Sequence, residues 1–142
     1  MRYFDTSFLV PLFLQEATSV RIERAMAGLA DQDLAISHWT RVEFSSLLAR
    51  EVRMGSLDAR TAREVDAEFE SVARQSFTVL LPSGDDFDLA KQYIGRHQSG
   101  LRAGDALHLA IAQNHGSTHV YSLDNTLLKA GRLLGLPMTR GI

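Results

Sequence analysis

Two hydrophobic patterns alternate along this chain: short runs of consecutive hydrophobic residues, and longer stretches in which hydrophobic residues recur every three or four positions. The short runs predict strands, and the longer stretches predict amphipathic helices. Strands are expected at residues 2–4, 33–37, 77–81 and 118–123, with an edge strand at 136–139. Strands that alternate with helices form parallel sheets with helices on both faces. The pattern therefore predicts an α/β fold with a central, mostly parallel sheet of about five strands.

Helices are predicted between these strands. Residues that are common at helix ends indicate where some of these helices begin or stop. Asp58 is a good N-cap for a helix over 59–75, and Gly55 is a typical stop for a helix over 39–54. Within the helix over 39–54 we expect Val42 and Leu47 on the inner side, and Glu43 is a candidate for the same side. The other predicted helices cover 17–30, 85–96, 103–114 and 125–134, and residues 7–15 form a short helix or an irregular turn.

Composition limits the class of protein. The 142 residues include 45% hydrophobic and 23% charged residues, which is ordinary for a globular domain in water. No hydrophobic run is long enough to span a bilayer, and Asp5 and Glu16 interrupt the N-terminal hydrophobic segment, which argues against a signal peptide. The absence of cysteine excludes disulfides, zinc–thiolate sites and thiol catalysis. We expect a single domain over 1–142 that is cytoplasmic and not bound to a membrane.

Four acidic residues lie where an α/β fold places functional groups. Asp5 ends the first hydrophobic run, and Asp124 follows the fourth. Asp105 opens the most hydrophobic helix, and Glu43 lies within the helix over 39–54. Carboxylates at strand ends and in first helical turns can converge on one crevice of an open α/β sheet. Because hard divalent cations take oxygen ligands, the four acids are candidate metal ligands.

Each acid also has a purely structural explanation. Asp5 and Asp105 could cap helices or favour the helix dipole, and Asp124 could be a turn residue. Glu43 could pair with a neighbouring arginine at the surface. No single acid is convincing, but the set of four favours a common site.

The net charge of −2 argues against a surface covered in positive charge for nucleic acid. It does not exclude a local site, because two divalent cations bound by the acids would make the net charge positive. The candidate phosphate contacts are then Arg41, Arg50, Arg53, Arg102, Arg132 and Arg140.

Motifs of other enzyme classes are missing from the sequence. His108 and His115 lack the His-Glu-x-x-His spacing, and we favour core or surface roles for all five histidines. Ser7 lacks the Gly-x-Ser-x-Gly context of hydrolases, and there is no Gly-x-x-x-x-Gly-Lys phosphate loop. Trp39, the only tryptophan, is expected to pack in the core or to lie half-buried beside the site.

Four segments, in this order over nearly the whole chain, carry a resemblance to a known family. They are Met1-Arg-Tyr-Phe-Asp5-Thr-Ser-Phe-Leu-Val10 with Glu16 downstream, Arg41-Val-Glu43-Phe, Leu101-Arg-Ala-Gly-Asp105-Ala-Leu-His-Leu-Ala110, and Ser122-Leu-Asp124 with the Leu-Leu and Ala-Gly that follow. Together they resemble PIN-domain proteins of the VapC-type toxin group, the ribonuclease half of bacterial toxin–antitoxin pairs.

The resemblance implies a PIN-like three-layer fold and an Mg²⁺- or Mn²⁺-dependent endoribonuclease. Its metal-binding and catalytic residues would be Asp5, Glu43, Asp105 and Asp124, supported by Thr6, Ser7 and Ser122. Ser122 stands where threonine is frequent in the family, and it keeps the hydroxyl group. The resemblance also implies an RNA substrate, a cognate antitoxin and a homodimer.

Other functions predict different residues at these positions. A haloacid-dehalogenase-like enzyme needs a second Asp two residues after Asp5, where this chain has Ser7. A receiver domain needs a lysine at a strand end, and neither Lys91 nor Lys129 is so placed. An RNA-processing nuclease without a toxin role remains an alternative. So does a non-catalytic PIN binding module, although such modules usually lack some of the acids.

Overall fold

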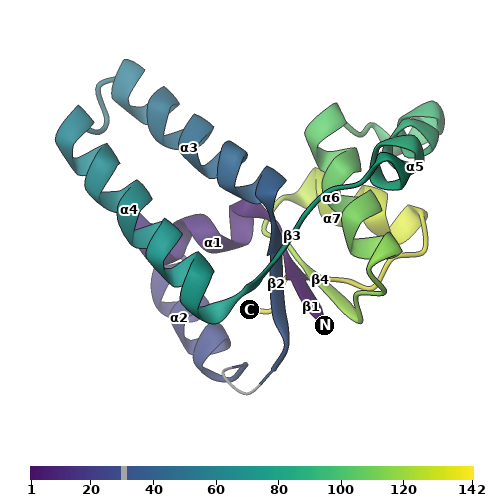
Figure 1. Ribbon diagram of the computed structural model, residues 1–142, viewed down its shortest axis with the longest axis horizontal. Helices are drawn as coiled ribbons and strands as arrows, with labels where there is room; N and C mark the ends of the chain where they lie inside the picture. The colour runs from purple at the N-terminus through teal and green to yellow at the C-terminus, as the bar shows by residue number, and fades with distance from the viewer. Residues whose placement is uncertain (30–31) are drawn as a thin grey trace.

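Within residues 1–29 and 32–142, which the computed structural model describes, five parallel strands form one central sheet (Figure 1). In spatial order the strands are β3 (Thr78–Leu80), β2 (Leu34–Ser37), β1 (Arg2–Phe4), β4 (His119–Tyr121) and β5 (Met138–Thr139). The predicted α/β class and the parallel sheet, including its edge strand β5, are confirmed.

Helices cover both faces of the sheet, so the fold has three layers. Figure 1 shows α1 to α4 on one side of the sheet and α5 to α7 on the other. Their bounds are α1 (Thr6–Phe13), α2 (Ser19–Ala27), α3 (His38–Arg53), α4 (Ala59–Ser76), α5 (Gly84–Gly95), α6 (Ala103–Asn114) and α7 (Asn125–Leu133). In the part of the chain that is described, no helix is both long and apolar enough to cross a membrane.

Helix α3 has its buried side at positions that the sequence only partly predicted. Val42, expected on the inner side, is 58% exposed. The buried residues are Thr40, Phe44 and Leu48, which follow one another at intervals of four. Because each residue turns an α-helix by about 100°, a residue two positions before Phe44 points away from the core. The prediction for Val42 was therefore wrong, whereas Leu47 is half-buried.

Two N-terminal helices differ in extent from their predictions. The segment predicted as a short helix or an irregular turn is the regular helix α1, which continues through Pro11. Helix α2 begins at Ser19 and ends at Ala27, inside the predicted range 17–30. The predicted end at residue 30 lies outside the described residues.

The strand order creates a topological switch point between β1 and β4. From β1 the chain builds outward through β2 and β3, and it returns through α5 and α6 to β4 on the other side of β1. The carboxyl ends of β1 and β4 are therefore neighbours whose connections lead in opposite directions. Open α/β sheets bind ligands in the crevice outside such a point. Asp5 directly follows β1, and Asp124 lies three residues after β4.

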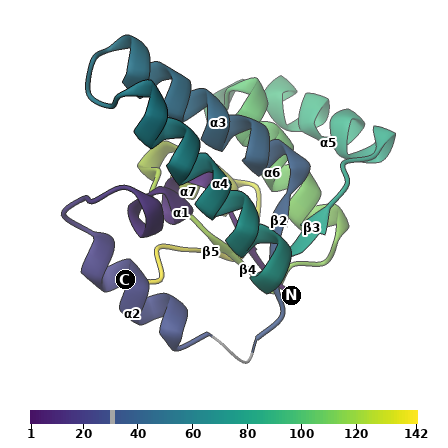
Figure 2. The same cartoon turned by 60° about the vertical axis from the view of Figure 1, so that its left-hand side comes forward.

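Helices α3 and α4 pack side by side, as Figures 1 and 2 show, and project together beyond the sheet. Phe44 of α3 stacks on Phe69 of α4 with ring centroids 4.0 Å apart. Arg41 and Glu70 add a two-pronged ion pair, with N–O distances of 2.8 and 2.9 Å. This packing fixes the direction of α3, the helix that carries Glu43.

Candidate active site

Asp5 is held at the end of β1 by hydrogen bonds to both carboxylate oxygens. Its Oδ1 accepts from the Ser7 hydroxyl at 2.8 Å and from the Phe8 backbone N–H at 3.1 Å, which caps helix α1. Its Oδ2 accepts from the Ser122 hydroxyl at 2.8 Å. Burial raises the pKa of Asp5, although the charge of His108 and these hydrogen bonds oppose that effect. Asp5 is thus a helix cap and a buried carboxylate at the switch point.

Asp124 likewise caps a helix beside the switch point. Its Oδ1 accepts from the backbone N–H groups of Thr126 and Leu127 at 2.7 and 3.0 Å, at the start of α7. The Ser7 hydroxyl accepts from the backbone N–H groups of Leu123 and Asp124 at 2.9 and 3.2 Å. Ser7 therefore ties the segment after β1 to the segment after β4 and brings the two acids together.

Glu43 reaches the same region from α3, and its Oε2 atom is fixed by two donors. His108 Nε2 donates at 2.5 Å, and the Thr6 hydroxyl donates at 2.6 Å. Burial acts to raise the pKa of Glu43, but the hydrogen bond and charge of His108, together with the Thr6 hydroxyl, lower it overall. Both donors contact Oε2 and favour the ionised form of Glu43. Oε1 takes part in neither contact.

His108 belongs to this site, although the sequence favoured only a core or surface role for it. The side chain is 1% exposed and projects from α6. Its Nδ1 lies 2.7 Å from the Tyr3 hydroxyl, which donates to Ser37 Oγ at 3.0 Å. A buried chain of polar groups thus connects the ends of β1 and β2 to Glu43. A single histidine without a metal-binding spacing gave no sequence signal for this contact.

Asp105 lies in the first turn of α6 and is half-buried. Burial raises the pKa of Asp105, and the neighbouring charges of Asp124 and Glu43 add to the effect. The second of these causes matters for function, because like charges close together create a local excess of negative charge. A bound cation would offset that excess.

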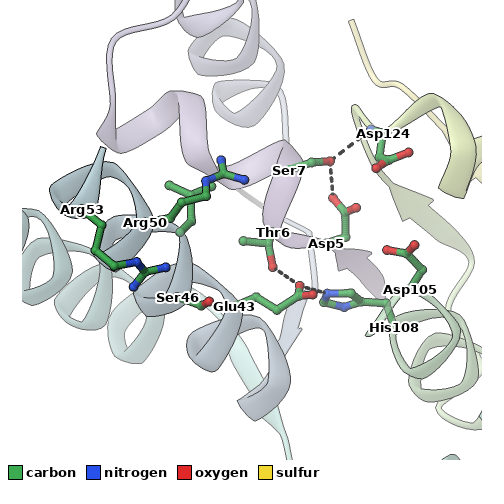
Figure 3. A pocket seen from close by; sticks show the side chains of 11 residues that line it. Asp5, Thr6, Ser7, Glu43, Ser46, Arg50, Arg53, Asp105, His108 and Asp124 are labelled. Atoms are coloured by element: carbon green, nitrogen blue, oxygen red, sulfur yellow. Dashed lines mark hydrogen bonds and ion pairs between the residues drawn. The ribbon is translucent and has the colours of Figure 1, made fainter. Parts of the chain in front are cut away.

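All four predicted acids line one cleft of about 390 Å³, shown in Figure 3. Thr6, Ser7 and His108 line it with them. Ser122, the third predicted supporting residue, is fully buried behind Asp5 instead of facing the cleft. Four segments distant in sequence therefore converge on one space, as the sequence predicted.

The candidate arginines fall into different settings. Arg50 and Arg53 line the same cleft from the C-terminal half of α3, as Figure 3 shows. Arg102 lines a second cavity next to the cleft. Arg41 is engaged by Glu70, and Arg140 donates to Asn125 Oδ1 at 2.7 Å. Positive charge at the acidic cleft thus comes from the far end of α3.

The donor set fits a hard divalent cation in chemistry and in charge. Carboxylate oxygens are the preferred ligands of Mg²⁺, which keeps several water molecules and often uses only one or two protein carboxylates directly. Over residues 1–29 and 32–142, no three Asp, Glu or His side chains are already arranged as ligands of a single ion. The charges of Asp124 and Glu43, which add to the effect of burial in raising the pKa of Asp105, would favour a cation beside this residue.

Comparisons with known proteins agree with the fold. The family model described as PIN domain matches residues 2–133. No curated protein sequence matches the chain.

Three solved structures illustrate the structural likeness. VapC20 from Mycobacterium tuberculosis, described as a Sarcin-Ricin loop cleaving toxin, has a TM-score of 0.73 and 22% identity, covering 92% of this chain and 95% of that one. VapBC2 from Rickettsia felis, bound to a DNA fragment from their promoter, has a TM-score of 0.74 and 13% identity, covering 98% of each chain. A toxin-antitoxin complex from Klebsiella pneumoniae has a TM-score of 0.66 and 19% identity, covering 100% of this chain and 98% of that one.

Proposed function

The chain belongs to the PIN domain family, and on that basis we propose that it is a metal-dependent ribonuclease acting as the toxin of a toxin–antitoxin pair. The observation that carries the proposal is the convergence of Asp5, Glu43, Asp105 and Asp124 on one cleft at the switch point of the sheet. The fold that the chain shares with VapC20, a Sarcin-Ricin loop cleaving toxin, supports the toxin role.

The four carboxylates would hold Mg²⁺ or Mn²⁺. A divalent cation bound there supplies Lewis acidity toward the phosphodiester and lowers the pKa of a neighbouring water molecule. The protein keeps the carboxylates in position before the substrate arrives. Ser7 and Ser122 orient Asp5, and His108 and Thr6 orient Glu43. Such preorganisation matters because groups that are already aligned need no rearrangement during the reaction.

The arginines of α3 would bind the RNA backbone next to these acids. Arg50 and Arg53 line the cleft, and both are exposed to solvent. Cationic side chains at a nucleic-acid site neutralise phosphates and release their counterions, so binding through them weakens as the salt concentration rises. The cleft therefore pairs a negative centre for cations with a positive side for phosphates.

An antitoxin is the proposed protein partner. Val20 of α2 and Val42 of α3 are 62% and 58% exposed, so hydrophobic side chains of two helices face solvent. Single exposed hydrophobic residues are common on protein surfaces, so the main support for an antitoxin is the shared fold. The toxin-antitoxin complex from Klebsiella pneumoniae shares the fold, which supports an antitoxin as the partner. A second copy of this chain is the other candidate partner.

Expression in bacteria tests the toxin role. Induction of the wild-type chain is expected to arrest growth, because uncontrolled RNA cleavage stops protein synthesis. Co-expression of the small protein encoded immediately upstream should restore growth. Cells that express the Asp105→Asn chain to the same level serve as the control and should grow normally. Equal growth with and without the upstream gene, with intact wild-type protein present, would instead support an RNA-processing nuclease.

A further inference from the structure

A second cavity of about 430 Å³ adjoins the acidic cleft. It shares Glu43, Asp105 and Asp124 with the cleft, so these acids lie between the two spaces. Its other walls include Trp39 at the start of α3 and Arg102 just before α6. The mechanism above uses none of these additional residues.

Trp39 is placed to present part of its ring to this cavity. The side chain is half-buried and packs against the hydrophobic cluster around α6. Gly104 makes the close approach possible, because a Cβ atom there would lie 3.1 Å from the Trp39 ring and 2.9 Å from Glu43 Oε1. The indole N–H is close enough to favour the ionised form of Glu43, but it makes no hydrogen bond of good geometry within the described residues. The ring is thus fixed immediately beside a proposed metal ligand.

The spacing of the lining residues along α3 suits a single-stranded polynucleotide. Trp39, Glu43 and Arg50 follow one another on this helix, and Trp39 and Arg50 are separated by about 16 Å along its axis, from a rise of 1.5 Å per residue. Aromatic rings and arginines are the groups that bind the bases and phosphates of single-stranded nucleic acid. A single nucleotide could not contact both ends of this row, whereas a polynucleotide crossing the acids could.

We propose that the Trp39–Arg102 cavity is a nucleotide subsite: it takes a base of a single-stranded RNA against Trp39 and an adjacent phosphate at Arg102, on the side of the acids opposite to Arg50 and Arg53. This assignment rests on the proposed ribonuclease function. It makes Trp39 and Arg102 substrate-binding residues and gives the strand a path through both cavities.

The subsite can be tested by fluorescence, because Trp39 is the only tryptophan in the chain. The Asp5→Asn chain, expected to be inactive, would be titrated with a short single-stranded oligoribonucleotide of mixed sequence in Mg²⁺. Asp5 does not line the second cavity, so this change leaves the subsite intact. Saturable quenching of tryptophan emission is expected. Adding Arg102→Gln should raise the Kd about tenfold, the loss of one charge-assisted contact.

Matched variants separate binding from structure. Arg21→Gln, at an exposed position of α2 that lines neither cavity, should leave the Kd unchanged. In the otherwise wild-type chain, Trp39→Leu should raise the KM for RNA about tenfold, the scale of one lost base stack, with a smaller change in kcat. Trp39→Phe, which keeps an aromatic face, should recover part of that loss.

Unchanged emission at saturating RNA, or equal Kd values for Arg102→Gln and Arg21→Gln, would overturn the subsite. Quenching by an acidic peptide but not by RNA would also overturn it and would assign the cavity to a protein partner. Emission reports binding alone, so the titration decides the question even if the wild-type chain fails to cleave RNA. That failure would refute the proposed function separately.

Discussion

Replacing Asp5 or Asp105 by asparagine is expected to lower the rate of RNA cleavage on the order of 10³-fold, the scale at which removal of one preorganised polar group from a reacting site acts. Asparagine keeps the shape of the side chain but removes its charge. The site then loses attraction for a divalent cation, and Asp5 also loses acceptor capacity toward Ser7 and Ser122. Initial rates on single-stranded RNA in excess Mg²⁺ would measure the effect.

Loss of activity in these variants should not come from unfolding. Burial raises the pKa of Asp5 in the folded chain above its unfolded value. The neutral form of Asp5 therefore stabilises the folded chain. This stabilisation is fully present below the pKa that Asp5 has in the unfolded chain, and it is lost as the pH rises through the pKa that Asp5 has in the folded chain. At neutral pH without metal, Asp5→Asn should unfold at the same temperature as the wild type or at a higher one. Full cleavage by this variant would place the chemistry elsewhere.

Phe44→Ala is expected to lower the free energy of unfolding by about 3–5 kcal/mol, the usual cost of removing a buried phenyl ring. Phe44 is completely buried, stacks on Phe69 and makes an edge contact with Phe13 at 5.5 Å. Its loss leaves a cavity between α1, α3 and α4. Chemical denaturation followed by circular dichroism would measure the change.

Val42→Ala is the matched control on the same helix. Val42 is 58% exposed, so its truncation should change the free energy of unfolding by no more than about 0.5 kcal/mol. The comparison also tests the rotation of α3 about its axis, since Glu43 lies between these two residues. An equal loss of stability in both variants would contradict that rotation, and with it the direction in which Glu43 points.

The arrangement of strands and helices was predictable because each segment carries its own hydrophobic period. The run that became β1 and the most hydrophobic helix, α6, were recognisable in this way. The side of α3 that faces the core was less accessible. Thr40 is buried there through hydrogen bonds with Ser37 that form a capping box, whereas the more hydrophobic Val42 is exposed. Hydrophobicity alone would wrongly predict that Val42 is more buried than Thr40.

The acids of the candidate site could be proposed from their places relative to strands and helices. The sequence allows Asp5 and Asp124 either a structural or a functional role, and in the structure both side chains cap helices and also line the cleft. A helix N-terminus at a strand end serves both purposes, because the acceptor that satisfies the first backbone N–H groups also faces the crevice.

The contacts that orient the site could not be read from sequence. His108 meets Glu43 across 65 positions of the chain, and Tyr3 meets His108 across 105. Neither pair has a characteristic spacing, since the contacts depend on how α3 and α6 pack on the sheet. The same is true of the second cavity, whose walls come from α3, α6 and α7.

The central claim is that the acidic cleft cleaves RNA with the help of a divalent metal, and cleavage by the purified wild-type chain tests it most directly. Single-stranded RNA would be incubated with the protein in Mg²⁺, in excess EDTA, and in EDTA followed by excess Mg²⁺. Cleavage is expected in Mg²⁺, should stop in EDTA, and should return when Mg²⁺ is restored, with the Asp5→Asn chain inactive throughout. Undiminished cleavage by the wild-type chain in EDTA, or cleavage by the Asp5→Asn chain equal to that of the wild type in Mg²⁺, would contradict the claim.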